Sequence, residues 1–201
     1  MFLDNSLQDF VDKVSGNDPF PGGGSVSACV GGMATALIEM VSNLTIDKKG
    51  YEDNWDEMKM IRSEIRVIKE DLLRLIEEDS KSYEAVMEAF RLPKSTDEEK
   101  AARSEAIQHG TYLAALVPLN IARKCLEGFE FVKPVLIKGN RNAWSDAKVS
   151  AVMLRSAIYG AIFNVKINLE SLKDQALVTS LQNEIGDILR QADKLEQDAL
   201  S

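Results

Sequence analysis

The chain of 201 residues has a single histidine, His109, and only two cysteines, Cys29 and Cys125. With one imidazole, the chain cannot assemble a metal cluster built on histidine ligands. The two cysteines are far apart in apolar segments that offer nothing to stabilise a thiolate, so we expect reduced, buried thiols. The sequence therefore predicts neither a metal site nor a redox cofactor.

Positive charge is also scarce. The chain has 24 lysines and arginines against 32 aspartates and glutamates, which gives a net charge of -8 at pH 7. This balance argues against nucleic acid as the main partner, because binding to phosphates requires a dominant basic surface. No run of about 18 apolar residues occurs, and the acidic N-terminus lacks the apolar core of a signal sequence. We expect a cytoplasmic protein that binds neither nucleic acid nor membrane.

Strand patterns and internal repeats are missing as well. No segment alternates apolar and polar residues as a half-buried strand does, whereas apolar residues recur at helical spacing along most of the chain. The helices expected from this spacing are residues 4–14, 26–44, 54–92, 97–126, 129–137, 146–172 and 174–200. A chain of this length can bury one core. The sequence predicts a single all-α domain, residues 1–201, built as a multihelical bundle of long and short helices.

Glycine is concentrated in the string PFPGGGSVSA, residues 19–28. Gly22, Gly23 and Gly24 can adopt positive φ and allow a ligand to approach the backbone, and Ser25 is a suitable N-cap for the helix that follows. Exposed amides at a helix start bind anions or polar heterocycles. The alternative is a tight turn that only redirects the chain. The string is neither a nucleotide P-loop nor a dinucleotide fingerprint, because no Gly-Lys-Ser/Thr follows and no strand precedes it.

One acidic residue interrupts an apolar seam in the long helix expected at 54–92. The seam has a period of 3.5 residues and consists of Met58, Ile61, Ile65, Ile68, Leu72 and Leu75. The next position of the seam is Asp79, whereas Glu77 and Glu78 lie off it. A carboxylate buried on such a seam costs several kcal/mol unless it is paired or protonated, and burial raises its pKa. Asp79 is therefore either a proton donor or half of an ion pair across the bundle.

Further polar groups stand out in three places. Lys48 and Lys49 lie in the polar break after the second helix, where two solvated lysines are the simplest interpretation. The loop 139–146, GNRNAWSD, combines amide, hydroxyl and guanidinium groups, and its Ser145 suits a helix N-cap. Asn164 and Asn168 lie one turn apart in an apolar helix and need hydrogen-bond partners.

Several separated strings of the chain resemble, in order, the formiminotetrahydrofolate cyclodeaminase and methenyltetrahydrofolate cyclohydrolase family. They are PFPGGGSVSA, ALIEMVSNLT, DSKSYEAVMEAFRLPKST, AIQHGTYLAALVPLNIAR, GNRNAWSDAKVSA and GAIFNVKINLESLKD. The resemblance extends along almost the whole chain. It implies an all-helical subunit, a homodimer or larger assembly with the site near the subunit interface, and folate as the ligand. The seam that contains Ile61 and Ile65 is compatible with a helical dimer contact.

The resemblance also implies roles for individual residues. Asp79 matches the aspartate that acts as proton donor in the family, which agrees with the seam argument. Gly22, Gly23, Gly24 and Ser25 would line the folate pocket. Lys48 and Lys49 match a basic pair that could meet the glutamate tail of folate. The residues that would contact the pterin or support the site are Asn140, Ser145, Asp146, Asn164 and Asn168.

Three functions remain open from the sequence. A cyclodeaminase converts 5-formiminotetrahydrofolate to 5,10-methenyltetrahydrofolate and releases ammonia. Some single-domain relatives instead hydrolyse the methenyl bridge to give 10-formyltetrahydrofolate. The third possibility is a helical dimer that binds folate without catalysis, against which the retention of Asp79 argues. Neither reaction requires a metal or a redox cofactor, and the tetrahydrofolate derivative is the substrate.

Overall fold

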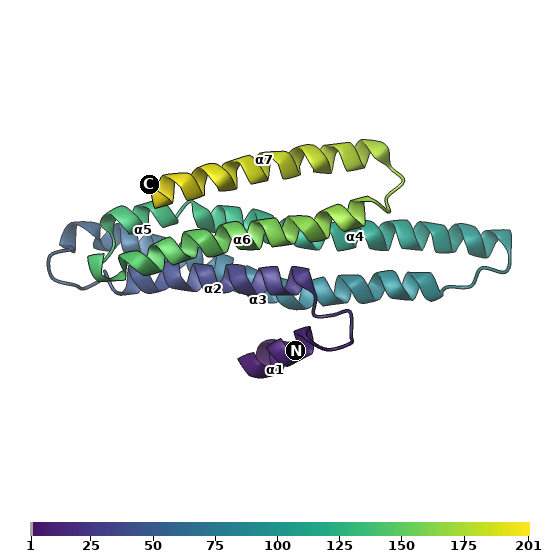
Figure 1. The fold of residues 1–201 in the computed structure, drawn as a ribbon, viewed down its shortest axis with the longest axis horizontal. Helices are drawn as coiled ribbons and strands as arrows, with labels where there is room; N and C mark the ends of the chain where they lie inside the picture. The colour runs from purple at the N-terminus through teal and green to yellow at the C-terminus, as the bar shows by residue number, and fades with distance from the viewer. Residues whose placement is uncertain (1) are drawn as a thin grey trace.

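A computed structural model describes residues 2–201, which form helices and connecting turns with no strand among them. The helices run nearly parallel to the long axis of the molecule (Figure 1). Their bounds are α1 Leu7–Val14, α2 Gly23–Asn43, α3 Trp55–Arg91, α4 Asp97–Phe129, α5 Val132–Lys138, α6 Trp144–Leu169 and α7 Gln175–Leu200, with short 3-10 turns at Phe2–Asp4, Glu52–Asn54 and Arg141–Ala143. The prediction of an all-α fold is confirmed.

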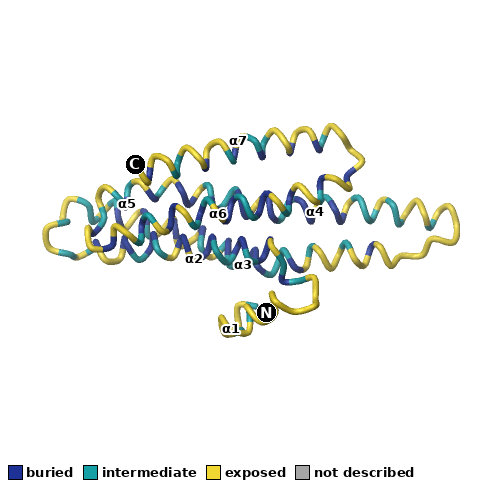
Figure 2. Tube along the Cα trace, viewed as in Figure 1, coloured by how far each residue is buried: buried dark blue, intermediate teal, exposed yellow. Residues whose placement is uncertain are grey.

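Four long helices form the central bundle. Helix α2 packs against α3 and α6, and α4 packs against the same two helices, so the four helices close a ring around one core. Helix α7 covers α6 and α4, and α1 lies to one side. Burial is concentrated where the four helices overlap, and it decreases along α1 and the projecting ends of α3 and α4 (Figure 2).

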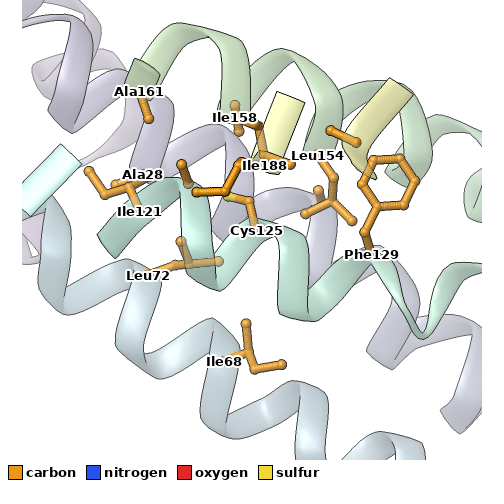
Figure 3. Packing of buried hydrophobic residues seen from close by; sticks show 14 of the residues in the cluster. Ala28, Ile68, Leu72, Ile121, Cys125, Phe129, Leu154, Ile158, Ala161 and Ile188 are labelled. Atoms are coloured by element: carbon orange, nitrogen blue, oxygen red, sulfur yellow. The ribbon is translucent and has the colours of Figure 1, made fainter. Parts of the chain in front are cut away.

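The seam predicted on α3 is buried inside the subunit. Met58, Ile65 and Leu72 are fully buried, and Leu72 packs beside Cys125 of α4 and Ala28 of α2 in the core shown in Figure 3. Side chains of this size contribute about 1.5–3 kcal/mol each when buried. The interior of the subunit therefore uses the seam completely, and α3 has no apolar surface there for a dimer contact.

Two predicted helix caps are wrong. Helix α2 begins at Gly23 with Gly22 as its N-cap, and Ser25 lies inside the first turn. Helix α6 begins at Trp144, so Ser145 is also inside its helix. In both cases the helix begins before the first residue that the apolar pattern predicts to be helical. Sequence patterns do not fix the first residue of a helix.

The positive φ predicted for the three glycines is also wrong. Among residues 2–201 only Asp47 and Gly50 have positive φ, and Gly22 has a φ of -109°. The glycine string is therefore not explained by its backbone conformation. The side chains that lie against it, described with the candidate site below, explain it instead.

Helix α2 is long and apolar enough to cross a membrane by length and composition alone. In this structure, however, 61% of its most apolar window is buried inside the bundle. Burial between α3, α6 and α4 explains the apolar residues on the sides of α2 that face these helices, whereas Met33 and Leu44 on the remaining side are exposed.

The close packing of α2 on α4 can be tested at Gly31. A methyl group at Gly31 would lie 2.5 Å from Sγ of Cys125, so Gly31→Ala should lower the free energy of unfolding by about 1–3 kcal/mol. Cys125→Ala removes the obstructing sulfur. The double variant should therefore be more stable than the sum of the two single changes predicts, as measured by urea denaturation. Additive effects would contradict this packing.

Candidate active site

The Asp79 carboxyl group is held by the first turn of α2. Its Oδ2 atom accepts a hydrogen bond of 2.8 Å from the Ser25 backbone N–H and one of 2.9 Å from the Ser25 hydroxyl. Ser25 itself is completely buried. The first turn of a helix has backbone N–H groups without helical partners and carries the positive end of the helix dipole. This turn therefore stabilises a negative charge on Asp79.

Gly24 allows the carboxyl group to approach the helix. A Cβ atom at Gly24 would lie 2.1 Å from Oδ1 of Asp79, which is impossible without displacing the acid. A Cβ atom at Gly23 would lie 2.9 Å from Nδ2 of Asn164. The glycine string is thus needed for the close approach of side chains from α3 and α6, and not for an unusual backbone conformation.

Two opposing effects act on the pKa of Asp79. Burial is the larger effect and raises the pKa above its ordinary value of 3.8, whereas the two hydrogen bonds from Ser25 lower it. Within residues 2–201 the carboxyl group takes part in no ion pair, and Ser25 provides its only hydrogen bonds. The alternative of an ion pair across the bundle is therefore wrong.

Asp79 lines a cavity of about 280 Å³ between the glycine string and the helices α3, α4 and α6. The rings of Phe20 and Tyr83, 6.3 Å apart, form part of its wall and offer aromatic surface to a flat ligand. The remaining lining residues include Pro19, Gly22, Gly23, Ser82, Ala114, Asn164, Ile167 and Asn168. A mainly apolar groove of about 360 Å³ between α2 and α6 shares Gly23 and Asn164 with this cavity.

The two asparagines of α6 that line the cavity have oriented amide groups. Nδ2 of Asn168 donates to the carbonyl oxygens of Ala114 and Asn164, at 2.9 Å each. Nδ2 of Asn164 donates to the carbonyl oxygen of Gly160 at 2.8 Å. Because a carbonyl oxygen can only accept, these bonds fix the orientation of both amides and leave each Oδ1 as an acceptor. A carboxyl group and two amide oxygens therefore lie around one cavity.

The other predicted site residues lie near the opposite end of α2. Lys48 donates to Oδ1 of Asn140 at 2.7 Å, and the Asn140 amide donates to the carbonyl oxygen of Leu44. Lys49 and Ser145 are exposed at the same end, and Asp146 is partly buried there. The 21 residues of α2 span about 30 Å. Within one subunit these residues do not share the cavity of Asp79.

The sequence analysis missed Phe20 and Tyr83 as cavity residues. Tyr83 lies one helical turn after Asp79, so helical spacing places it on the same side of α3, and this signal could have identified it. It also missed that Ser25 bonds directly to Asp79, since nothing in a local pattern distinguishes a cap from a contact between two helices.

Other polar features of the fold have partners of their own. Glu39 is buried on α2 and forms ion pairs with Arg66 and Lys69 of α3, which explains how its charge is accommodated.

A larger cavity of about 600 Å³ lies between α6 and α7, but Asp79 is not among its lining residues. Within the described part of the chain, no three His, Cys, Asp or Glu side chains lie close enough together to hold a metal ion.

Comparisons with known proteins agree on one family. The model of the family described as formiminotransferase-cyclodeaminase matches residues 6–187. A methenyltetrahydrofolate cyclohydrolase of Methylorubrum extorquens is 36% identical over 192 residues, which cover 96% of this chain and 92% of that protein. The formimidoyltransferase-cyclodeaminase of Mus musculus is 32% identical over 94% of this chain, which spans 35% of that longer protein. The solved structure of a formiminotetrahydrofolate cyclodeaminase from Thermotoga maritima has a TM-score of 0.88 and 31% identity, with 99% of this chain and 96% of that chain covered.

The contact between Gly24 and Asp79 can be tested without an activity assay. Gly24→Ala should lower the free energy of unfolding by about 1–3 kcal/mol, because the new methyl group displaces the carboxyl group. In an Asp79→Ala background the obstruction is gone, so the same change should be nearly neutral. Gly186→Ala on α7 is a matched control, since its methyl group would meet only the flexible end of Arg190. An equal loss of stability in both backgrounds would refute the contact.

Proposed function

The chain belongs to the formiminotransferase-cyclodeaminase family, and on that premise we propose that it catalyses the cyclodeamination of 5-formiminotetrahydrofolate. The observation that carries this proposal is the Asp79 carboxyl group, which is half-buried, has no cationic partner among the described residues and lines a cavity with an aromatic wall. A carboxyl group of raised pKa holds a proton closer to neutral pH than an exposed one does, which suits a general acid.

Cyclodeamination requires one proton at a defined step. N10 of tetrahydrofolate attacks the formimino carbon on N5, and the N10 proton passes to the exocyclic nitrogen, which becomes the amino group of the tetrahedral adduct. The adduct then breaks its bond to that nitrogen. Asp79 donates a proton to that nitrogen, so that ammonia leaves and the 5,10-methenyl bridge remains. Positioned proton transfer of this kind accelerates a reaction about 10²–10⁴-fold. The positive charge of the methenyl product suits a cavity lined by Asn164 and Asn168, whose Oδ1 atoms are free to accept.

Hydrolysis of 5,10-methenyltetrahydrofolate is the second candidate. The relative from Methylorubrum extorquens, which carries the name of that activity, aligns over 92% of its own length. In this reaction the ionised Asp79 accepts a proton from the water that attacks the methenyl carbon. It then returns the proton to N5 as the carbon–N5 bond breaks, and the hydroxyl group of the adduct releases its own proton to water, which yields 10-formyltetrahydrofolate. The same carboxyl group thus serves either reaction in opposite protonation states.

The two activities differ in their products. Purified protein incubated with 5-formiminotetrahydrofolate should release ammonia while the absorbance of the methenyl product rises. A cyclohydrolase incubated with 5,10-methenyltetrahydrofolate should instead remove that absorbance without releasing ammonia. Binding of folate with neither change would identify the protein as a non-catalytic folate binder.

Asp79→Asn tests the role of the acid. The amide is nearly isosteric with the carboxyl group but cannot donate its proton in the same way, so turnover should fall about 10²-fold or more while folate affinity is largely kept. Near-normal turnover, measured by steady-state kinetics, would remove Asp79 from the mechanism.

The stability of the same variant should depend on pH in a defined direction. Because the folded pKa of Asp79 is raised above 3.8, the folded protein binds more protons than the unfolded chain between these two pKa values. The stabilising contribution of Asp79 is therefore complete below about pH 3.8 and is lost as pH rises through the folded pKa. Relative to the wild type, Asp79→Asn should become more stable over that interval in urea denaturation. A constant difference at all pH values would contradict the raised pKa.

We further propose that the chain forms a homodimer through the outer face of α2 and α6. Two apolar rows with the spacing of a helical interface lie on these helices. They consist of Val26, Val30, Met33, Leu37, Met40 and Leu44 on α2 and of Val149, Val152, Phe163 and Ile167 on α6. Phe163 is 64% exposed and Ile167 is 61% exposed. The groove between α2 and α6 contains Val26, Val30 and Phe163 together, so the two rows share one face.

An antiparallel dimer on this face would reunite the separated site residues. In a two-fold arrangement the same surface of each subunit meets its counterpart, and the two ends of α2 exchange places. The end that carries Lys48, Lys49 and Asn140 in one subunit would then lie beside the Asp79 cavity of the other. The lysines could meet the glutamate tail of a folate bound there, which offsets the acidic net charge locally.

Phe163→Glu tests this interface. A charge at the centre of an apolar contact should dissociate the dimer, so that light scattering returns the single-subunit mass near 22.3 kDa. Val67→Glu is the matched control, since Val67 is 57% exposed on α3, outside the two rows, and it should remain dimeric. A single-subunit mass for the wild type at micromolar concentration would overturn the proposal.

A further inference from the structure

The Ser25 hydroxyl has two possible acceptors for its single proton. It lies 2.9 Å from Oδ2 of Asp79 and 3.1 Å from the backbone carbonyl oxygen of Ile76, one turn earlier on α3. The Ser80 hydroxyl is a third neighbour at 3.3 Å. Because Ser25 is completely buried, it cannot touch a ligand in the cavity and acts only through these neighbours.

We propose that Ser25 is the positioning residue of Asp79, and that its N–H and hydroxyl hold Oδ2 so that Oδ1 exchanges the proton with the substrate. The inference rests on the proposed function, since it assigns the proton of the proposed general acid to one oxygen atom. It also gives the buried Ser25 hydroxyl a role that differs from a helix cap and from a ligand contact.

The two carboxyl oxygens have different surroundings. Oδ2 receives both hydrogen bonds from Ser25, whereas Oδ1 has no hydrogen bond within the described chain. Oδ1 is also absent from the buried polar atoms that lack a partner, so it reaches the open space of the cavity that Asp79 lines. A proton on Oδ2 would face the Ser25 N–H, donor against donor. The proton of the neutral acid therefore resides on Oδ1.

The hydroxyl group can follow the charge of Asp79. When Asp79 is ionised, the Ser25 hydroxyl donates to Oδ2 and stabilises the charge. When Asp79 is protonated on Oδ1, its Oδ2 remains a carbonyl oxygen that accepts from the hydroxyl, and the Ile76 carbonyl oxygen, with a lone pair beside its helical bond, is a second acceptor. A buried hydroxyl without an acceptor is costly. With two acceptors in reach, Ser25 has one in both states, and Asp79 can gain and lose its proton without a rearrangement of the helices.

No charged group competes with Ser25 at this carboxyl. Among residues 2–201, the only other titratable side chain that lines the cavity is Tyr83, on α3 itself. Helix α6 contributes the neutral amides of Asn164 and Asn168, α4 contributes Ala114, and the segment before and at the start of α2 contributes Pro19, Phe20, Gly22 and Gly23. Hydrogen bonds from Ser25 are therefore the main local influence that opposes the effect of burial.

Ser25→Ala tests the inference through the titration of Asp79. With 13C-labelled aspartate, the carboxyl resonance of Asp79, assigned by its loss in Asp79→Asn, should titrate at a pH about 1–2 higher in Ser25→Ala, because one hydrogen bond to the ionised form is lost. The descending limb of the kcat profile should move to higher pH by the same amount. Affinity for 5-formyltetrahydrofolate should change less than about twofold, since Ser25 contacts no ligand.

Ser42→Ala is the matched control. Ser42 is equally buried on α2, but its hydroxyl donates only to the Ile38 carbonyl oxygen of its own helix. This variant should leave the Asp79 titration unchanged. An unchanged titration in Ser25→Ala as well would overturn the inference. A shifted titration in a protein that turns over neither folate would preserve the inference about positioning while removing the proposed function.

A measurement on the unmutated protein covers the case in which Ser25→Ala does not fold. The backbone N–H of Ser25 donates to Oδ2, so its amide proton resonance should shift with the same midpoint pH as the Asp79 carboxyl resonance. The shift should be absent in Asp79→Asn. A Ser25 amide resonance that does not respond to pH over that range would refute the hydrogen bond on which the inference depends.

Discussion

Two hydrogen bonds from the first turn of α2 to Oδ2 of Asp79 connect the chemistry of this protein to its fold. They require Gly24 to have no side chain, since a Cβ atom there would occupy the place of the carboxyl group. They also require α2 and α3 to lie close together along their shared face. The position of the Asp79 carboxyl group is therefore a product of helix packing, and its hydrogen bonds come from Ser25, which does not line the cavity.

The rest of the bundle maintains that approach. Small residues such as Gly31 allow α2 to sit close to Cys125 of α4. The ion pairs of the buried Glu39 with Arg66 and Lys69 join α2 and α3 further along. On the other side, α6 places Asn164 against Gly23 and thereby closes the cavity. Helix α2 is thus the common element of the core, the cavity and the exposed apolar face on which the proposed dimer depends.

Sequence periodicity was sufficient to predict the helices and to place Asp79 on the same side of α3 as the buried seam. The seam of α3 has a strict spacing, and an acid at a seam position stands out because burial of charge is costly. The same reasoning failed for Ser25. A serine near a helix start suits a cap, and only the position of another helix reveals that it serves a carboxyl group 54 residues away. Matching of motifs likewise does not show how far apart two residues lie in the folded subunit. It therefore placed Lys48 and Asn140 in one site with Asp79, although the two ends of α2 are about 30 Å apart. The sequence also did not predict which face of α2 is exposed, because a helix that is apolar on nearly all sides does not indicate which side faces outward.

In the proposed reaction, Oδ1 of Asp79 faces the reacting atoms of a folate in the cavity beside the glycine string. A crystal structure with bound 5-formyltetrahydrofolate measures this directly, because the formyl group occupies N5 and cannot lose ammonia. The account predicts that the pterin lies between Phe20 and Asn168, with Oδ1 within about 3.2 Å of the formyl group or N10. A folate bound in the cavity between α6 and α7, with Asp79 out of reach of its reacting atoms, would contradict the account.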